Sequence, residues 1–260
     1  MKSEVRKMKK IIAILLTAIL LCSTVAFAET VKMGSSIDFP PYEYYDDETG
    51  EIVGIDVEIA QAIAAKLGWE LEIVDMQFDS IIAAVVSGKV AFGMSGFTIT
   101  EERKQSVDFS TPYTVTQQSV IVPIGSAITS VEDIMNVENE YKIAVQIGTT
   151  GDLFITDDIE AKGLQHTVER YNKYHDAVLA VNSGKVDCMI VDEQVALNFV
   201  AANEGLTTLD TAYAVEEYAV CFAKDSSLYA DFNAALEELL ADGTVDAIFA
   251  KYIVEEEAAE

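Results

Sequence analysis

One arginine in this sequence stands where a helix normally disfavours a positive charge. Thr100 is placed to cap a helix whose first turn is Glu101–Arg103. The partial positive charge of a helix N-terminus favours anions and disfavours cations, so Arg103 needs an anion nearby. After residue 28 the chain has only one other arginine, Arg170, so Arg103 does not belong to a basic surface. Either a neighbouring glutamate neutralises it on an exposed helix face, or it binds the carboxylate of a ligand.

Two further polar positions follow runs that read as buried strands. Asp192 ends the apolar run that begins at Cys188, a position where an aspartate frequently caps the following helix. The turn Gly148–Asp152 follows the strand-like segment Tyr141–Ile147 and begins another helix, where backbone N–H groups can bind an anion. Turns rich in glycine and threonine are also common connectors.

The sequence lacks the side-chain combinations of an enzyme active site. His166 and His175 are the only histidines, and we expect both on the surface or in helices. No nucleophile is spaced to meet a base, and neither a phosphate-binding loop nor a cluster of metal ligands is present. We therefore predict no catalytic residues, no metal site and no cofactor.

The first 28 residues are typical of a secretory signal peptide. Five Lys and Arg residues precede the apolar run Ile11–Leu21, and Ala26–Ala28 has the small residues of a cleavage site. The run is too short to be a good membrane span. We expect export and cleavage after Ala28, with Met8 as an alternative start. A lipid anchor on Cys22 is the competing interpretation, but the preceding leucine is larger than the residue such sites prefer.

The charge of the chain excludes whole classes of partner. The formal net charge is −27, and residues 29–260 carry 12 basic and 43 acidic residues, which gives −31. Nucleic acids and anionic membrane surfaces bind positively charged proteins, so neither is an expected partner. No second long apolar run follows the leader.

A faint internal repeat predicts the architecture. The segment Ser80–Val90 resembles Asp176–Val186, with an offset of 96 residues throughout. Each copy reads as an amphipathic helix, a Ser-Gly stop and a buried strand. A repeat this long is not a solenoid, so it indicates two similar α/β lobes. The predicted strands are Val31–Ser35, Trp69–Val74, Val90–Met94 and Tyr141–Ile147, and the predicted helices include Gly54–Leu67, Tyr229–Leu240 and Ala247–Ile253.

Several short segments, in their order and spacing, together resemble the family 3 solute-binding proteins of ABC importers, the type that binds polar amino acids. The resemblance extends over the whole chain after the leader. The matching segments are Phe39–Tyr44 followed by Gly54–Val57, then Phe78–Ile82, Ser87–Lys89, Thr98–Arg103, Asp108–Tyr113 and Val186–Glu193.

The resemblance implies a type II periplasmic-binding-protein-like α/β fold, with two lobes joined by two hinge strands and a ligand cleft between them. The first lobe would comprise residues 29–115 and 217–260, and the second lobe residues 116–216. Cys188 and Cys221 then fall in different lobes, so we expect two unpaired core thiols rather than the disulfide that an exported protein can form.

The resemblance also implies how an amino acid would be held. Arg103 would bind the α-carboxylate through two parallel hydrogen bonds, with the N–H groups of Thr98 and Thr150 completing the anion site. The α-ammonium would meet the Gly96 carbonyl, the Thr98 hydroxyl and the Asp192 carboxylate. Two phenylalanines would sandwich the ligand's side chain. The candidate ligand-binding residues are Ser36, Phe39, Phe78, Ser95, Gly96, Thr98, Arg103, Gln146, Thr150 and Asp192.

Two uncharged positions bear on which amino acid is bound. Ser36 stands where relatives that prefer cationic side chains often carry an acid, and the Gln146 amide suits a neutral polar group. These residues favour glutamine or a similar ligand, while nearby Asp38 and Glu43 leave a basic amino acid or cystine open.

The expected function is capture of an L-amino acid by hinge closure and its delivery, by a monomeric protein, to the permease subunits of an ABC importer. A dehydratase on the same fold is one alternative. A receptor's sensing domain is another, and such a chain should continue into a membrane span, whereas this sequence ends at Glu260.

Overall fold

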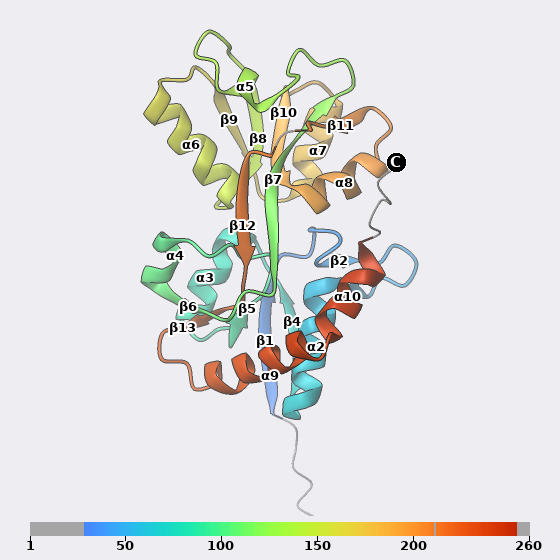
Figure 1. The fold of residues 1–260 in the computed structure, drawn as a ribbon, viewed down its shortest axis with the longest axis vertical. Coiled ribbons are helices and arrows are strands. Elements are labelled where there is room, and N and C mark those ends of the chain that lie inside the picture. The colour runs from blue at the N-terminus through green and yellow to red at the C-terminus, as the bar shows by residue number, and fades with distance from the viewer. Residues whose placement is uncertain (1–28, 211, 254–260) are drawn as a thin grey trace, which may run out of the picture.

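Two α/β lobes lie end to end in the computed structural model, which describes residues 29–210 and 212–253. Figure 1 shows one sheet in each lobe, with helices packed around it and two long strands running between the lobes. The predicted two-lobe α/β architecture is confirmed. The predicted signal peptide, with Cys22, lies outside the described residues. None of the helices within the described ranges is both long and apolar enough to span a membrane.

The first lobe, at the bottom of Figure 1, is built on a five-stranded sheet in the order β4-β1-β5-β13-β6. Strand β1 lies between β4 and β5 and is parallel to both, whereas β13 runs antiparallel to β5 and β6. Its strands are β1 (Thr30–Ser35), β4 (Glu70–Asp75), β5 (Phe92–Gly93), β6 (Val107–Phe109) and β13 (Cys221–Ala223), with the hairpin β2 (Tyr44–Tyr45) and β3 (Ile52–Val53); its helices are α2 (Ile55–Leu67), α3 (Phe78–Val86), α4 (Glu101–Ser106), α9 (Tyr229–Ala241) and α10 (Thr244–Tyr252).

The second lobe is built on the sheet β11-β7-β10-β8-β9, with β12 as a further partner of β7. Strands β8, β9 and β10 are parallel, and β7 is antiparallel to β10. Its strands are β7 (Thr114–Pro123), β8 (Lys142–Gln146), β9 (Thr167–Tyr171), β10 (Cys188–Asp192), β11 (Leu206–Thr208) and β12 (Ala214–Tyr218), and its helices are α5 (Val131–Ile134), α6 (Thr150–Lys162), α7 (Tyr174–Asn182) and α8 (Glu193–Ala201).

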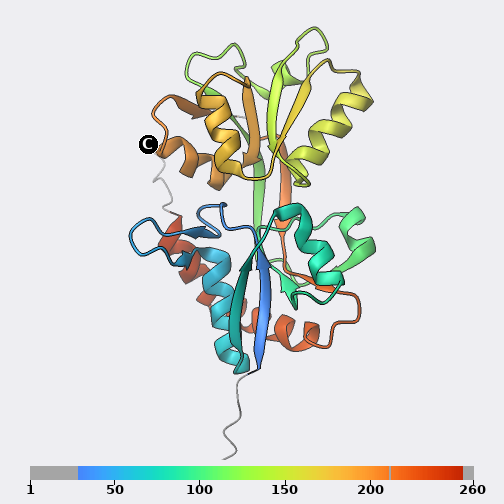
Figure 2. The same ribbon diagram turned by 180° about the vertical axis from the view of Figure 1, so that it is seen from behind.

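Strands β7 and β12 form the connection between the lobes. They pair antiparallel, with Thr114 opposite Tyr218 and Gln118 opposite Ala214. Seen from behind in Figure 2, this ribbon runs along the middle of the molecule from one lobe to the other. The chain therefore passes into the second lobe through β7 and returns through β12.

The internal repeat appears in the structure at the predicted offset. Helices α3 and α7 begin and end 96 residues apart, and each is followed by a strand of its sheet, β5 or β10. Both helices stop at a Ser-Gly pair whose glycine has a left-handed backbone, with φ of 72° at Gly88 and 68° at Gly184. Each lobe therefore uses the same helix-to-strand unit.

Most predicted element limits agree with the structure to within about two residues, the usual uncertainty of helix and strand ends. The strand predicted over residues 90–94 is shorter, because only Phe92 and Gly93 pair in register as β5. The N–H groups of Ala91 and Met94 still donate to carbonyls of β1, at 2.8 and 3.1 Å. The chain leaves the sheet at Gly96, where φ is +56°.

The cysteine prediction is confirmed and the histidine prediction is half wrong. Cys188 lies in the second-lobe sheet and Cys221 in the first-lobe sheet, and both are buried and free. His175 is exposed in α7. His166 is buried in a loop, where its Nδ1 accepts the Tyr141 N–H at 3.0 Å and its Nε2 lies 2.6 Å from the Ile134 carbonyl. The His166 ring thus links Ile134 and Tyr141 in the second lobe.

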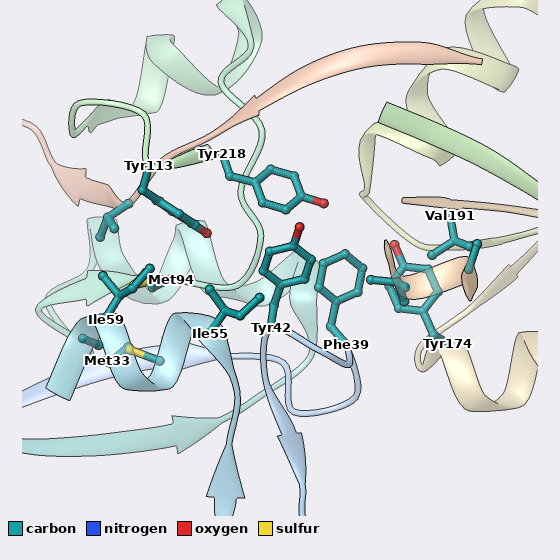
Figure 3. Close-up of a cluster of buried hydrophobic side chains, with 14 of the residues drawn as sticks. Met33, Phe39, Tyr42, Ile55, Ile59, Met94, Tyr113, Tyr174, Val191 and Tyr218 are labelled. Carbon is teal, nitrogen blue, oxygen red and sulfur yellow. The ribbon is translucent and has the colours of Figure 1, made fainter. Parts of the chain in front are cut away.

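A row of aromatic rings, stacked except for the edge-on pair of Tyr218 and Tyr42, crosses from the first lobe to the second. Figure 3 shows Tyr218, Tyr42, Phe39 and Tyr174 following one another. The ring centroids are 5.2 Å apart for Tyr218 and Tyr42, 5.5 Å for Tyr42 and Phe39, and 5.3 Å for Phe39 and Tyr174. Aromatic pairs at such separations stabilise a fold beyond their buried area. The row thus packs the lobes directly against each other.

The start of α2 depends on a glycine. Gly54 has φ of 132°, and a Cβ there would lie 2.1 Å from the Tyr42 carbonyl oxygen. We expect Gly54→Ala to lower the free energy of unfolding by about 3 kcal/mol or more, because both the backbone and its neighbour must move. Gly50 also has a positive φ, 72°, but its Cβ would meet nothing within 4 Å.

Gly50→Ala is therefore the matched control, with an expected loss of about 1 kcal/mol from the left-handed backbone alone. Urea unfolding of the two variants measures both losses. Equal losses would contradict the proposed clash.

Candidate functional site

A small cavity lies between the lobes, with a volume of about 10 Å³, which is about the space that one water molecule needs. All its lining residues are buried. From the first lobe they are Ser36, Phe39, Phe78, Ser95, Gly96, Thr98 and Arg103, and from the second lobe Gln146, Thr149, Thr150, Tyr174 and Asp192. All ten residues singled out in the sequence therefore lie around one cavity.

Two lining residues escaped the sequence analysis. Tyr174 is the first residue of α7, and the 96-residue repeat relates it to Phe78, the first residue of α3. That symmetry would have been sufficient to find it. Thr149 precedes the predicted Thr150 and caps α6, where its hydroxyl accepts the Asp152 N–H at 3.3 Å.

Arg103 is buried rather than neutralised on the surface. Thr100 caps α4 as predicted, with its hydroxyl accepting the Arg103 N–H at 3.1 Å. The guanidinium lies over the rings of Phe78 and Phe97, 5.4 and 5.3 Å from their centroids. Glu101 instead pairs with the exposed Lys104, at 2.8 Å, so the surface alternative for Arg103 is wrong.

The guanidinium of Arg103 bonds to both lobes. Its Nη1 donates to the Thr98 carbonyl at 2.8 Å, and its Nη2 donates to the Gly148 carbonyl of the second lobe at 3.1 Å. These bonds use two of five N–H donors. Burial lowers the pKa of Arg103, and the charge of Glu216 partly opposes that shift. An arginine remains charged under these conditions, so the cavity wall carries a positive group with further N–H donors.

Asp192 provides the opposite charge from the second lobe. It ends β10 and occupies the N-cap position of α8, as the capping interpretation predicted, but its side chain makes no capping hydrogen bond to that helix. The side chain is buried, and within the described ranges its Oδ1 has no hydrogen-bond partner. Burial, and secondarily the charge of Glu216, raises the pKa of Asp192 to about 8.

Glu216 is a second buried carboxylate beside this site. It lies on β12, where its Oε2 accepts hydrogen bonds from the Thr98 hydroxyl and the Gln118 amide, both at 3.0 Å. The sequence did not point to it. Its neighbour Glu217 is exposed and of the same type, so only the pairing of β12 distinguishes the two.

A pair of buried acids holds the strand end behind the cavity. The Ser95 hydroxyl donates to the Glu43 carboxylate and accepts the Ser36 N–H at 3.0 Å, while the Gly96 N–H donates to Asp56 at 2.9 Å. Burial raises the pKa of Glu43 well above its usual range and that of Asp56 to about 7. Glu43, which the sequence left open as a partner for a cation, is occupied by this structural role.

Uncharged polar groups from both lobes line another part of the wall. The Ser36 hydroxyl donates to Asp38 at 3.0 Å, and the Gln146 amide donates to the Asn172 carbonyl at 3.1 Å. In the part of the chain that the structure describes, no group of three or more His, Cys, Asp or Glu side chains is placed to hold a metal ion. The cavity thus combines one buried cation, one buried acid and neutral polar groups.

The sequence pattern of bacterial extracellular solute-binding proteins, family 3, matches residues 31–255. This chain belongs to that family. The arginine-binding extracellular protein ArtP of Bacillus subtilis is 34% identical over 233 residues, which cover 86% of each chain. Other family relatives are named for binding histidine, cystine or glutamine.

Solved structures of this family have the same two-lobe fold. An ancestral arginine-binding protein bound to arginine is 37% identical, with a TM-score of 0.79 over 86% of this chain and 98% of that one. An ancestral arginine-binding protein bound to glutamine is 36% identical, with a TM-score of 0.79 over 87% and 99%. An ancestral amino-acid-binding protein described as a precursor of cyclohexadienyl dehydratase is 32% identical, with a TM-score of 0.77 over 86% and 96%.

The burial of Asp192 makes stability depend on pH. Its pKa of about 8 in the folded protein lies above the ordinary value of 3.8. Between these values the folded protein holds a proton that the unfolded chain has lost, so its contribution to stability falls as the pH rises. We expect Asp192→Asn to stabilise the ligand-free protein relative to the parent by an amount that grows from pH 5 to pH 8, by at most about 1.4 kcal/mol per pH unit.

Urea unfolding at several pH values measures this difference. Asp187→Asn, at an exposed residue just before β10, controls for the loss of one negative charge. A difference between Asp192→Asn and the parent that does not change with pH would contradict a buried, protonated Asp192.

Proposed function

We propose that this protein captures one L-amino acid with an uncharged polar side chain, glutamine above all, and delivers it to the permease subunits of an ABC importer. One observation carries the proposal. A small buried cavity has a guanidinium, Arg103, on its first-lobe wall and a carboxylate, Asp192, on its second-lobe wall. Such a pair complements the two charges that every free α-amino acid carries.

The α-carboxylate belongs at Arg103. The guanidinium is fixed by two carbonyls and two rings, so its remaining donors are held in place before a ligand arrives. A planar guanidinium binds a carboxylate through two parallel hydrogen bonds, which an ammonium cannot reproduce. Thr150, at the start of α6, adds a backbone N–H at a helix N-terminus.

The α-ammonium belongs at Asp192. Without a nearby cation, burial keeps the pKa of this carboxyl near 8, so its neutral form is favoured at neutral pH. An ammonium in contact with Asp192 favours the ionised form and offsets the cost of burial. Glu216 bonds to the hydroxyl of the cavity-lining Thr98 and lies close enough to raise the pKa of Asp192, so it reinforces the attraction for a positive group.

Capture works by hinge closure. Residues 29–115 and 217–260 would move as one lobe against residues 116–216, with β7 and β12 bending between them. The ligand's two charged ends contact different lobes, so it stabilises the closed form more than the open one. This differential contact is what makes binding and closure one event.

The neutral character of Ser36 and Gln146 supports a polar, uncharged side chain. The second candidate is a basic amino acid, because several relatives are named for binding arginine and three related structures are described as bound to arginine. An ancestral arginine-binding protein of the same fold is bound to glutamine in another related structure, which supports an amide side chain as well. We therefore place glutamine first and a basic amino acid or cystine second.

We infer a binding protein rather than an enzyme. A dehydratase would need a general acid or base beside its substrate. Among the lining residues only Asp192, Tyr174 and Arg103 titrate, and the first and last serve the two ends of the amino acid. We propose that the protein acts outside the cytoplasm as a monomer, after export directed by the signal peptide of residues 1–28.

Thermal unfolding against a panel of amino acids tests the function. The protein without residues 1–28 is unfolded and refolded to remove bound ligand, then mixed with each L-amino acid, ornithine, citrulline and cystine. A ligand at 100 times its Kd adds about 2.7 kcal/mol, so the true ligand should raise Tm by about 5 °C or more. We expect a shift with glutamine or a close analogue. A shift with basic amino acids alone favours the second candidate, and no shift contradicts an amino-acid site.

Arg103→Lys tests the carboxylate site. The variant keeps the positive charge but loses the paired hydrogen bonds, so we expect the affinity for the ligand to fall about 10- to 100-fold, the equivalent of one hydrogen bond to a charged group. Lys104→Arg, on the exposed side of the same helix, is the matched control. Titration calorimetry measures both variants, and unchanged affinity in Arg103→Lys would contradict the assigned role.

A further inference from the structure

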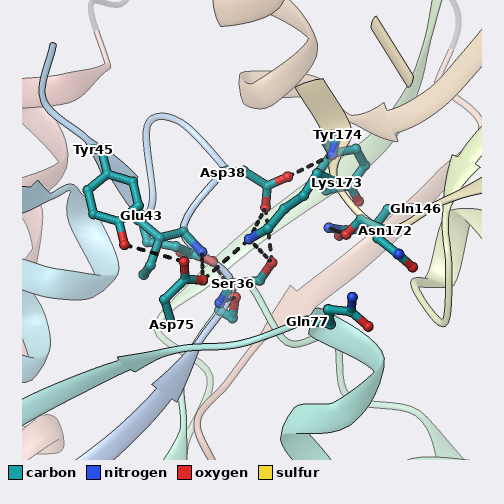
Figure 4. A network of polar contacts seen from close by, with 12 residues as sticks. Ser36, Asp38, Glu43, Tyr45, Asp75, Gln77, Gln146, Asn172, Lys173 and Tyr174 are labelled. Atoms are coloured by element: carbon teal, nitrogen blue, oxygen red, sulfur yellow. Dashed lines mark hydrogen bonds and ion pairs between the residues drawn. The ribbon is translucent and has the colours of Figure 1, made fainter. Parts of the chain in front are cut away.

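A lysine of the second lobe reaches across to two acids of the first lobe. The Lys173 ammonium lies 3.3 Å from Asp75 Oδ1 and 3.7 Å from Asp38 Oδ1. It is also 3.4 Å from the hydroxyl of Ser36. Figure 4 shows Lys173 pointing from the start of α7 into this group.

The helix that follows does not require a positive charge at this position. Lys173 is the residue before α7, and the 96-residue repeat relates it to Gln77, the residue before α3. Gln77 is neutral. A cation at a helix N-terminus is disfavoured by the helix dipole, so the charge of Lys173 serves something other than α7.

Ser36 connects this acidic pair to the cavity. It lines the cavity, and its hydroxyl donates to Asp38 at 3.0 Å. Asp38 therefore lies just behind a cavity wall, and Asp75, which is exposed, is joined to it through their shared contact with Lys173. A largely buried carboxylate such as Asp38 attracts a cationic ligand side chain more strongly than it would through water. The Lys173 ammonium contacts both carboxylates, and its positive charge opposes their attraction for a cationic ligand.

We propose that Lys173 determines the charge preference of the cavity, by offsetting Asp38 and Asp75 so that a neutral side chain is bound in preference to a cationic one. The inference rests on the proposed function and adds to it a specificity-determining residue. The acids that would attract arginine are present, but they are already paired with the ammonium of Lys173.

Lys173 also contributes to contact between the lobes, so its loss has a second effect. The next residue, Tyr174, donates its N–H to Asp38 at 2.6 Å, which places the lobe contact and the charge pair side by side. A weaker contact between the lobes lowers the affinity for every amino acid by the same factor. The ratio of two affinities is free of that common factor, and it is therefore the readout.

The test compares glutamine and arginine in the parent protein and in Lys173→Met, which keeps most of the length of the side chain and removes its charge. Titration calorimetry gives both Kd values. We expect the arginine-to-glutamine affinity ratio to rise by about tenfold or more, which corresponds to about 1.4 kcal/mol. Lys142→Met, four residues before Gln146 in the same lobe and exposed, removes the same charge away from the cavity and should leave the ratio unchanged.

A second substitution separates charge from space. Asp75→Asn keeps the shape of the acid and its acceptor oxygen, and in the Lys173→Met background it should take back most of the gain for arginine. A ratio that rises but does not respond to Asp75→Asn would assign the gain to added room and overturn the charge mechanism.

Two other results are distinguishable. If the parent binds amino acids but Lys173→Met weakens glutamine and arginine equally, Lys173 only joins the lobes and this inference is wrong, while the proposed function stands. If neither the parent nor the variant binds any amino acid, the proposed function fails and this inference fails with it.

Discussion

The buried ionisable side chains of Arg103 and Asp192 are the constraint around which the rest of the structure is arranged. A charge removed from water is costly unless a partner compensates it. Arg103 is compensated by two carbonyls and two aromatic faces, and Asp192 by a pKa shifted until its neutral form is favoured. Neither group is fully compensated for the cost of burial. The two lobes are therefore most stable together around a molecule that carries both complementary charges.

The fold brings these groups together at the carboxyl ends of its strands. Ser36 follows β1, Gly96 follows β5, Gln146 ends β8 and Asp192 ends β10. Ligands of open α/β sheets lie at such strand ends. Here the strand ends of the two sheets line the same cavity. The repeated helix-to-strand unit gives each lobe half of the site, with Phe78 and Tyr174 as related wall positions.

The sequence was sufficient to predict those elements that a local residue pattern or the internal repeat encodes. The Thr100 cap and the 96-residue offset predicted their elements because each depends on neighbouring residues alone. Glu216 and the contacts of Lys173 were not predictable in this way. They depend on how β12 pairs with β7 and on how one lobe faces the other, and an exposed acid such as Glu217 has the same local signature.

The enclosure of the cavity has a kinetic consequence. Every residue that lines it is buried, and Arg103 bonds to Gly148 while Phe39 stacks on Tyr174 across the two lobes. A molecule inside can escape only when these contacts part, so its residence time is governed by the opening rate of the protein. Under the proposed function, any event that parts these contacts would also release the ligand.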